Sequence, residues 1–366
     1  MSTPLLSVRG LSIALGADAR PASLVQDVSF DVSSGQILSI VGESGSGKSM
    51  TAKAIMGLLP PKASASGTAM FRGQNLLAKN AIQPRGTGIG LIFQEPMTAL
   101  TPVLTIGSQL TEAMVFHGLA NTSAANRRAA EMLDRVGIPN PAQRMRQYPH
   151  ELSGGMRQRV MIAMMMLLEP DILIADEPTT ALDVTVQAQI LDLLREIVFD
   201  TKIGLILITH DMGVVAEMAS DVIVMKAGKL VEAGSVQQIF HAPNAEYTRA
   251  LLDAVPSIET AHPASPSTES TVILSARNLH KTFRGQRGLG LVGPKTKALD
   301  DVSLDIRHGE TLALVGESGS GKSTLGRVFL RLTEADQGSV ELENINLLAL
   351  TGSQLRLTRR KIQMIF

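Results

Sequence analysis

The chain has 366 residues, of which 44% are apolar and 19% charged, as in folded globular proteins with two or three domains. Its 34 lysines and arginines balance its 34 aspartates and glutamates, so the net charge gives no sign of binding to nucleic acid or anionic lipid. The absence of cysteine excludes disulfides, thiolate metal sites and a cysteine nucleophile.

The N-terminal residues lack a basic region followed by a long apolar core, so no signal peptide is expected. The longest apolar run, 160–168, has nine residues, whereas a membrane-spanning helix needs about 20. We therefore expect any role at a membrane to be peripheral.

The first part of the chain contains a strand, a glycine-rich loop and a helix in succession. Short alternating segments before residue 33 predict strands, and the apolar run 37–41 predicts a short buried strand. The loop 42–49 follows, with the sequence GESGSGKS, and a helix is expected over 50–59, before Pro60 and Pro61. This succession is the sequence context of a phosphate-binding P-loop.

The P-loop sequence assigns a chemical task to its residues. Its glycines let the backbone curl so that successive amide N–H groups face an anion, and the helix N-terminus adds partial positive charge. Lys48 can reach the β and γ phosphates of a nucleotide, and the hydroxyl of Ser49 can ligate Mg²⁺. The nucleotide-binding residues predicted here are Gly42, Glu43, Ser44, Gly45, Ser46, Gly47, Lys48, Ser49 and Met50.

The next part of the chain changes from strands to helices. A strand is predicted at 68–71, and a second at 89–93 directly precedes Gln94. Helical periodicity follows over 105–117 and 124–136, and the sequence LSGGMRQR at 152–159 opens a further helix. Ser153, Gly154 and Gly155 form a helix start of small residues, which can bind an anion or simply cap the helix.

A buried strand predicted over 171–175 ends at two adjacent carboxylates. Asp176 can hold Mg²⁺, and Glu177 is a candidate general base for an attacking water. His210 follows another predicted buried strand and can donate a hydrogen bond to a γ-phosphate. The other elements expected in this part are helices over 184–198 and 245–254 and strands over 203–208, 222–225 and 229–231. Buried strands that alternate with helices predict an α/β fold with a mainly parallel sheet.

The region after residue 270 repeats the beginning of the chain. The sequence VGESGSGKS occurs at 41–49 and again at 315–323, each time after an apolar run, and residues 360–366 match 87–93. We therefore expect a complete first domain over 1–255, a flexible linker over 256–270, and the N-terminal part of a second domain over 271–366. The second set of predicted nucleotide-binding residues is Gly316, Glu317, Ser318, Gly319, Ser320, Gly321, Lys322, Ser323 and Thr324.

Six elements in this order resemble the motifs of the nucleotide-binding subunits of ATP-binding cassette (ABC) transporters. They are the P-loop, Gln94 (Q-loop), the sequence at 152–159 (signature), Asp176 and Glu177 (Walker B), residues 181–183 (D-loop) and His210 (H-loop). The resemblance implies a P-loop NTPase with a RecA-like core, an antiparallel β subdomain and a helical subdomain. It also implies ATP and Mg²⁺ as cofactors, catalytic roles for Lys48, Gln94, Glu177 and His210, and metal ligation by Ser49, Gln94, Asp176 and Ser323.

A closer resemblance is to the ATPases of oligopeptide, dipeptide and nickel importers. Four stretches carry it: QEPMTALTP at 94–102, YPHELSGG at 148–155, TTALDVTVQAQ at 179–189 and APNAEYTRALL at 242–252. It implies a peripheral subunit on the cytoplasmic face of the bacterial inner membrane that couples ATP hydrolysis to the uptake of peptides or a related small solute. The implied partners are two integral-membrane permeases, a periplasmic solute-binding protein and a second nucleotide-binding domain, from this chain if complete, otherwise from a homodimer or a paralogue. No nucleic acid partner is expected.

The sequence departs from the family pattern in two respects. The family commonly stacks adenine on an aromatic residue, which Phe283 offers in the second copy, whereas Leu15 stands at the matching place in the first. We expect the first domain to lose on the order of 1 kcal/mol of stacking. The second copy lacks a Walker B strand, so the chain alone is expected to bind nucleotide but hydrolyse it poorly. The sequence leaves two alternatives open: a non-transport ABC ATPase, and an ATP-binding protein that does not hydrolyse ATP.

Overall fold

The computed structural model describes residues 3–16, 22–94, 99–180, 182–255, 270–287, 291–317 and 319–365. The chain divides into two compact units, Met1–Pro256 and Ser257–Phe366, and each is considered by itself. The linker predicted over 256–270 lies, apart from Ser270, outside the described residues.

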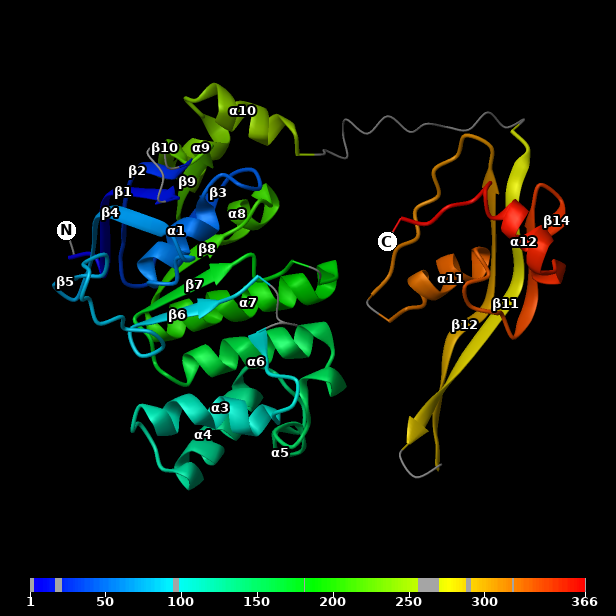
Figure 1. Ribbon diagram of the computed structural model, residues 1–366, viewed down its shortest axis with the longest axis horizontal. Helices are drawn as coiled ribbons and strands as arrows, with labels where there is room; N and C mark the ends of the chain where they lie inside the picture. Colours follow the sequence, from blue (N-terminus) through cyan, green and yellow to red (C-terminus); the bar gives the residue numbers. More distant parts are fainter. Residues whose placement is uncertain are drawn as a thin grey trace. The chain divides into compact units, whose positions relative to one another are not determined.

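A sheet of ten strands runs through the described part of the first unit, in the order β5-β4-β1-β2-β10-β9-β3-β8-β7-β6 (Figure 1). Strand β3 is parallel to β8 and β9, and β7 is parallel to β6 and β8. Strands β1, β2, β4 and β5 pair antiparallel with one another. The strands are β1 (Leu6–Leu15), β2 (Ala22–Val32), β3 (Ile37–Val41), β4 (Ala63–Phe71), β5 (Gln74–Asn75), β6 (Ile89–Ile92), β7 (Ile172–Asp176), β8 (Gly204–Ile208), β9 (Asp221–Lys226) and β10 (Lys229–Ser235).

Helices cover the parallel strands on both faces because these strands are apolar on both sides. In β7, Leu173 packs into one core and Ile174 into the other, as the twofold alternation of a strand requires. The two cores place α1 on one face and α6 and α7 on the other. The helices near the sheet are α1 (Lys48–Ile55), α7 (Val184–Thr201), α8 (Met212–Met218), α9 (Val236–His241) and α10 (Glu246–Asp253).

A group of helices lies beyond α6 (Gly154–Met166) at one end of the first unit (Figure 1). It comprises α3 (Ile106–Phe116), α4 (Thr122–Arg135) and α5 (Pro141–Arg144). Thr105, Asn121 and Ser153 cap helices of this region, each accepting a backbone N–H with its side chain. Among the described helices, none has the length and apolar character that crossing a bilayer requires. The parallel core, the antiparallel strands and the helical group match the predicted fold class.

The second unit contains one antiparallel sheet in its described residues, in the order β12-β11-β13-β14. Its elements are β11 (Val272–Arg287), β12 (Leu291–Arg307), α11 (Lys322–Phe329), β13 (Gln337–Leu342), β14 (Ile345–Asn346) and α12 (Gly352–Thr358). The apolar run 311–315, the counterpart of β3, is not a strand, and Val315 in it is 87% exposed. Strand β3 is held between β8 and β9, and no described strand of the second unit pairs with 311–315 in the same way.

Candidate functional site

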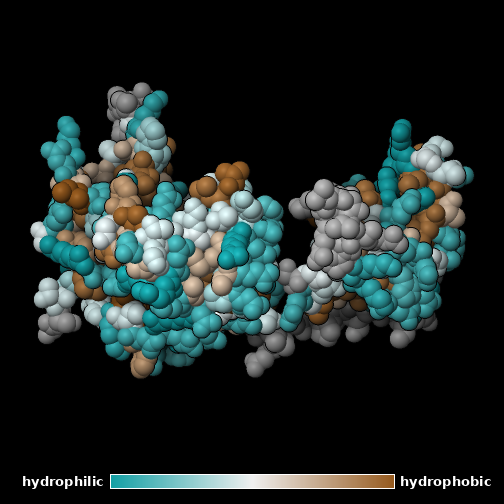
Figure 2. Space-filling model, turned by 90° about the horizontal axis from the view of Figure 1, so that it is seen from below, coloured by the Kyte–Doolittle hydropathy of each residue, from teal (hydrophilic) through white to brown (hydrophobic). Residues whose placement is uncertain are grey.

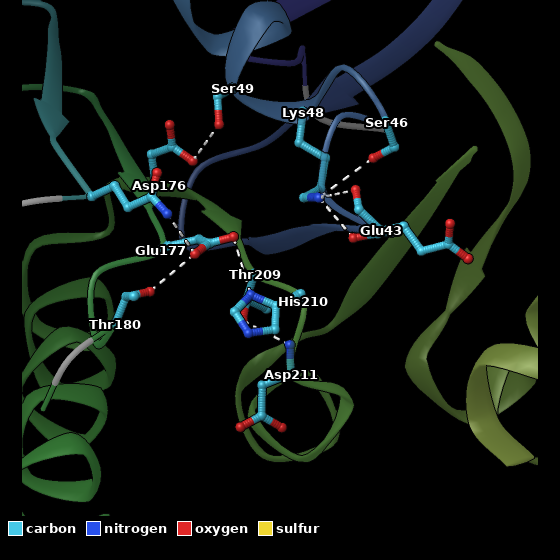
Figure 3. Close-up of polar contacts among 12 residues, drawn as sticks. Glu43, Ser46, Lys48, Ser49, Asp176, Glu177, Thr180, Thr209, His210 and Asp211 are labelled. Carbon is cyan, nitrogen blue, oxygen red and sulfur yellow. Dashed lines mark hydrogen bonds and ion pairs between the residues drawn. The ribbon is translucent and has the colours of Figure 1, made fainter. Parts of the chain in front are cut away.

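The loop between β3 and α1 curls around its own lysine (Figure 3). The Nζ of Lys48 donates to the carbonyl oxygens of Gly42, at 2.7 Å, and Glu43, at 2.8 Å, and lies 3.4 Å from the Oγ of Ser46. Burial lowers the pKa of Lys48, although the carboxylates of Glu177 and Asp176 oppose this shift. The side chain is only 5% exposed, so its charge acts in a partly desolvated site where electrostatic interactions are stronger than in water.

The outside of this loop packs against the end of β9 and the turn that follows it. Gly42 has φ +146°, and a Cβ there would lie 2.0 Å from the carbonyl oxygen of Met225. The N–H of Gly228 donates to the carbonyl of Ser46 at 3.0 Å. Only glycine fits at position 42, because this approach leaves no room for a side chain.

Asp176 stands at the carboxyl end of β7, beside the start of α1. Its Oδ1 accepts a hydrogen bond from the Oγ of Ser49 at 2.9 Å. Burial raises the pKa of Asp176, and this effect outweighs the hydrogen bond from Ser49. Parallel strands that end together at one edge of the sheet thus bring two residues together that are 127 positions apart.

Glu177 lies at the centre of a hydrogen-bonded cluster (Figure 3). Its carboxylate accepts from the Nε2 of Gln94 at 2.9 Å and from the Oγ1 of Thr180 at 3.0 Å, and it lies 3.1 Å from the Nδ1 of His210. Burial raises the pKa of Glu177, but the hydrogen bonds from His210 and Thr180 outweigh it, so the net pKa is lowered. Its φ of +47° is unusual for a side chain of this size, and such strain is often found at functional sites.

The donor set at this edge of the sheet fits a hard divalent cation. Ser49 supplies a hydroxyl oxygen, Asp176 a carboxylate and Gln94 an amide oxygen, which are the ligand types that Mg²⁺ prefers. Across the described part of the chain, no three His, Cys, Asp or Glu side chains form a metal site. A cation here would therefore complete its coordination with water and phosphate oxygens.

The sequence predicts two further sets of nucleotide-binding residues, one in each unit. Ser153 caps α6, its Oγ accepting the N–H of Met156 at 3.3 Å, with Gly154 and Gly155 in the first turn. No hydrogen bond among the described residues joins them to Lys48, Asp176 or Glu177. In the second unit, the Nζ of Lys322 donates to the carbonyls of Gly316, at 2.6 Å, and Glu317, at 2.7 Å, which repeats the geometry of the first loop.

The other predicted residues of the second unit make fewer described contacts than their counterparts in the first. Ser318 lies outside the described residues, and no carboxylate in the described part of this unit accepts a hydrogen bond from Ser323, which is exposed. The ring of Phe283 is 45% exposed, with the Nζ of Lys281 at 5.6 Å from its centroid. Leu15, at the matching place in the first unit, is 39% exposed.

Sequence reasoning missed two residues that touch the site. Thr180 bonds Glu177, and its position three residues further along the chain could have indicated this contact. The hydroxyl of Tyr247 accepts the backbone N–H of Glu43 at 3.3 Å, across 204 positions of sequence. No spacing or periodicity in the sequence indicates that second contact.

Comparisons with known proteins give the same family from sequence and from structure. The chain is 45% identical over 396 residues to the glutathione import ATP-binding protein GsiA of Escherichia coli (strain K12). This alignment covers 99% of the chain and 64% of that protein. The GsiA protein of Salmonella choleraesuis is 44% identical over 403 residues, with 100% and 64% covered. The chain thus spans 64% of the length of these relatives.

Solved structures of ATP-binding cassettes resemble the chain as well. The cassette MJ0796, in a dimeric post-hydrolysis state bound to ADP and Pi, superposes with a TM-score of 0.55 and 26% identity over 63% of this chain and 98% of that one. The cbiO1 protein of Clostridium perfringens, part of the ABC transporter complex cbiONQ, has a TM-score of 0.55 and 25% identity over 70% of this chain and 97% of that one. These likenesses confirm the predicted P-loop NTPase fold.

The family model described as ABC transporter matches residues 25–180 and 299–366, which together make up more than half of the chain. It covers both P-loops, Gln94, the sequence at 152–159 and the Walker B carboxylates, but not residues 181–183 or His210. The chain belongs to the ABC transporter family, whose cassettes bind nucleotide.

Proposed function

We propose that the chain is the ATP-binding subunit of an ABC importer and couples Mg²⁺-dependent ATP hydrolysis to uptake of a peptide or related small solute. The observation that supports this most is the meeting of the P-loop with two carboxylates, in which Ser49 lies 2.9 Å from Asp176 and Glu177 follows directly. The relatives named for glutathione import support a small peptide as the class of solute.

Nucleotide binding would use the curled loop and its lysine. The backbone N–H groups of residues 43–49 and the N-terminus of α1 would hold the phosphates. The ammonium of Lys48 donates to the carbonyls of Gly42 and Glu43, and on nucleotide binding it would move to donate to the phosphate oxygens instead. Mg²⁺, held by Ser49 and Asp176, would offset negative charge on the phosphoryl group.

Hydrolysis would depend on the cluster around Glu177. Its pKa is lowered, so the carboxylate is ionised at neutral pH and can accept a proton from the attacking water. The amide of Gln94 and the ring of His210 hold this carboxylate now, and both would also lie near the γ-phosphate. Because no hydrogen bond among the described residues joins Ser153, Gly154 or Gly155 to Lys48, we infer that they close over nucleotide held by a second domain.

The remaining partners follow from the importer assignment. Two integral-membrane permeases would receive the movement of the cassettes, a periplasmic protein would deliver the solute, and the chain would lie at the cytoplasmic face of the inner membrane. Apolar side chains are exposed on the helical group, where Phe116 is 84% exposed, and in the loop before α3, where Val103 is 76% exposed. Figure 2 shows apolar patches of this kind on a largely hydrophilic face of the first unit. Such side chains suit contact with another protein.

The proposal is tested by measuring ATP turnover with and without candidate permeases in proteoliposomes. We expect turnover to rise with the permeases and to fall about 10²- to 10⁴-fold in Glu177→Gln, the range for loss of a general base. The matched control is Glu196→Gln, which changes an exposed glutamate on α7. Turnover that responds to DNA or ribosomes instead of permeases would contradict the transport assignment. Nucleotide binding with no turnover in any of these preparations would contradict the ATPase assignment.

A further inference from the structure

The peptide group that joins Gly42 to Glu43 is held at both ends. Its carbonyl oxygen accepts from the Nζ of Lys48 at 2.7 Å. Its N–H donates to the hydroxyl of Tyr247 at 3.3 Å. Tyr247 comes from α10, near the C-terminal end of the first unit, and is not part of any nucleotide-binding motif in the sequence.

The position of the Tyr247 ring is fixed independently of its hydroxyl. The Nζ of Lys226 lies 4.3 Å from the ring centroid, a cation–π contact. The ring packs against a buried cluster that includes Val41, the last residue of β3, and Ile239 of α9. Replacement of the phenol by a phenyl ring would therefore remove one hydrogen bond and leave the packing in place.

The start of α10 is also anchored. The carboxylate of Glu232, which is 7% exposed, accepts the backbone N–H groups of Asn244, at 2.8 Å, and Ala245, at 3.1 Å. Burial acts to raise the pKa of Glu232, but hydrogen bonds outweigh it, so the pKa is lowered and the group stays ionised at neutral pH. A charged acceptor at a helix N-terminus is a strong attachment, so α10 is a rigid base for Tyr247.

We propose that Tyr247 is a positioning residue for the first P-loop, holding the Gly42–Glu43 peptide in the orientation that nucleotide binding requires. This inference rests on the proposed function, because it assumes that Lys48 moves from the Gly42 carbonyl to the phosphates. After that move, the hydrogen bond to the Tyr247 hydroxyl is the one of these two that still holds the peptide. Without it neither of these two bonds holds the peptide, and the amide groups that follow lose part of their alignment toward the anion.

The first test measures nucleotide affinity in the full chain with the second P-loop disabled by Lys322→Ala. In this background we expect Tyr247→Phe to weaken binding of a fluorescent ADP analogue by about two- to tenfold, the value of one hydrogen bond. The chain has two tyrosines, so Tyr148→Phe is the matched control and is expected to leave the affinity unchanged. Equal affinities of the Tyr247→Phe chain and its parent would overturn the proposal.

The second test leaves Tyr247 intact and so does not depend on whether Tyr247→Phe folds correctly. In the Lys322→Ala, Tyr148→Phe chain, Tyr247 is the single tyrosine, and its ¹³Cζ resonance can be followed by NMR after selective labelling. We expect this resonance to shift when Mg²⁺ and ADP saturate the first unit, because the hydroxyl contacts the loop that binds them. A resonance that does not move at saturation would also overturn the proposal.

A third variant separates this inference from the proposed function. Lys48→Ala in the Lys322→Ala background is expected to abolish binding of the ADP analogue. If Lys48→Ala binds normally, the proposed function fails together with the inference. If Lys48→Ala loses binding while Tyr247→Phe binds like its parent, the positioning role alone fails.

Discussion

The close packing of the first P-loop against β9 predicts that alanine substitutions at two glycines of this loop differ in their effect on stability. Gly42 has φ +146° and Gly45 φ +80°, so a side chain at either position costs about 1–3 kcal/mol of backbone strain. At Gly45 an added Cβ meets nothing within 4 Å. At Gly42 it would lie 2.0 Å from the carbonyl oxygen of Met225 and 2.9 Å from the Oγ of Ser46, so backbone must move.

We expect the two alanine variants to differ because only one of them is overpacked. Overpacking adds about 1–3 kcal/mol, which gives a total loss of about 2–6 kcal/mol for Gly42→Ala and about 1–3 kcal/mol for Gly45→Ala. The assay is urea unfolding followed by tyrosine emission. Both tyrosines, Tyr148 and Tyr247, belong to the first unit, and the chain has no tryptophan, so the signal reports this unit alone. Equal unfolding midpoints for the two variants would refute the reasoning.

Three further predictions concern the nucleotide site. Asp176→Asn should stabilise the nucleotide-free first unit by roughly 1 kcal/mol at pH 7, measured by thermal unfolding. Burial raises the pKa of Asp176 in the folded state, so the stability of the wild-type unit falls as the pH rises from the pKa of the unfolded state to that of the folded state. An unchanged or lower melting temperature would contradict this. Thr180→Val should raise the pKa of Glu177, since the hydroxyl stabilises the ionised form, and should move the acid limb of the kcat–pH profile to higher pH; a limb that stays in place would argue against Glu177 as the base. Leu15→Tyr should tighten ATP binding about fivefold through adenine stacking, measured by calorimetry, and a failure to tighten would speak against the adenine position proposed for the first unit.

Most of the fold and the motif residues could be predicted because they follow simple patterns. The strands that end at Val41 and Asp176 are continuous apolar runs, and parallel strands end at a common edge of the sheet. Hence Ser49 and Asp176 could be placed together before their 2.9 Å hydrogen bond was seen. The roles of these residues in binding metal and nucleotide stay predictions.

The features that the sequence did not predict depend on contacts between distant segments. Tyr247 and Glu43 are joined across 204 positions by the packing of α10 against a cluster that includes residues of β3 and β9, which no local pattern encodes. Helix α8 (Met212–Met218) has seven residues, too few to show a clear helical period. The run 311–315 has the same apolar character as β3, but no described strand of the second unit pairs with it, so composition alone could not decide its conformation.

The most direct test of the account is the stoichiometry of ATP binding to the full chain carrying Lys322→Ala, measured by calorimetry in the presence of Mg²⁺. We predict one ATP per chain, bound in the first unit, and no detectable binding once Lys48→Ala is added. Binding that persists unchanged in the double variant would contradict the claim that the first P-loop and its lysine hold the nucleotide.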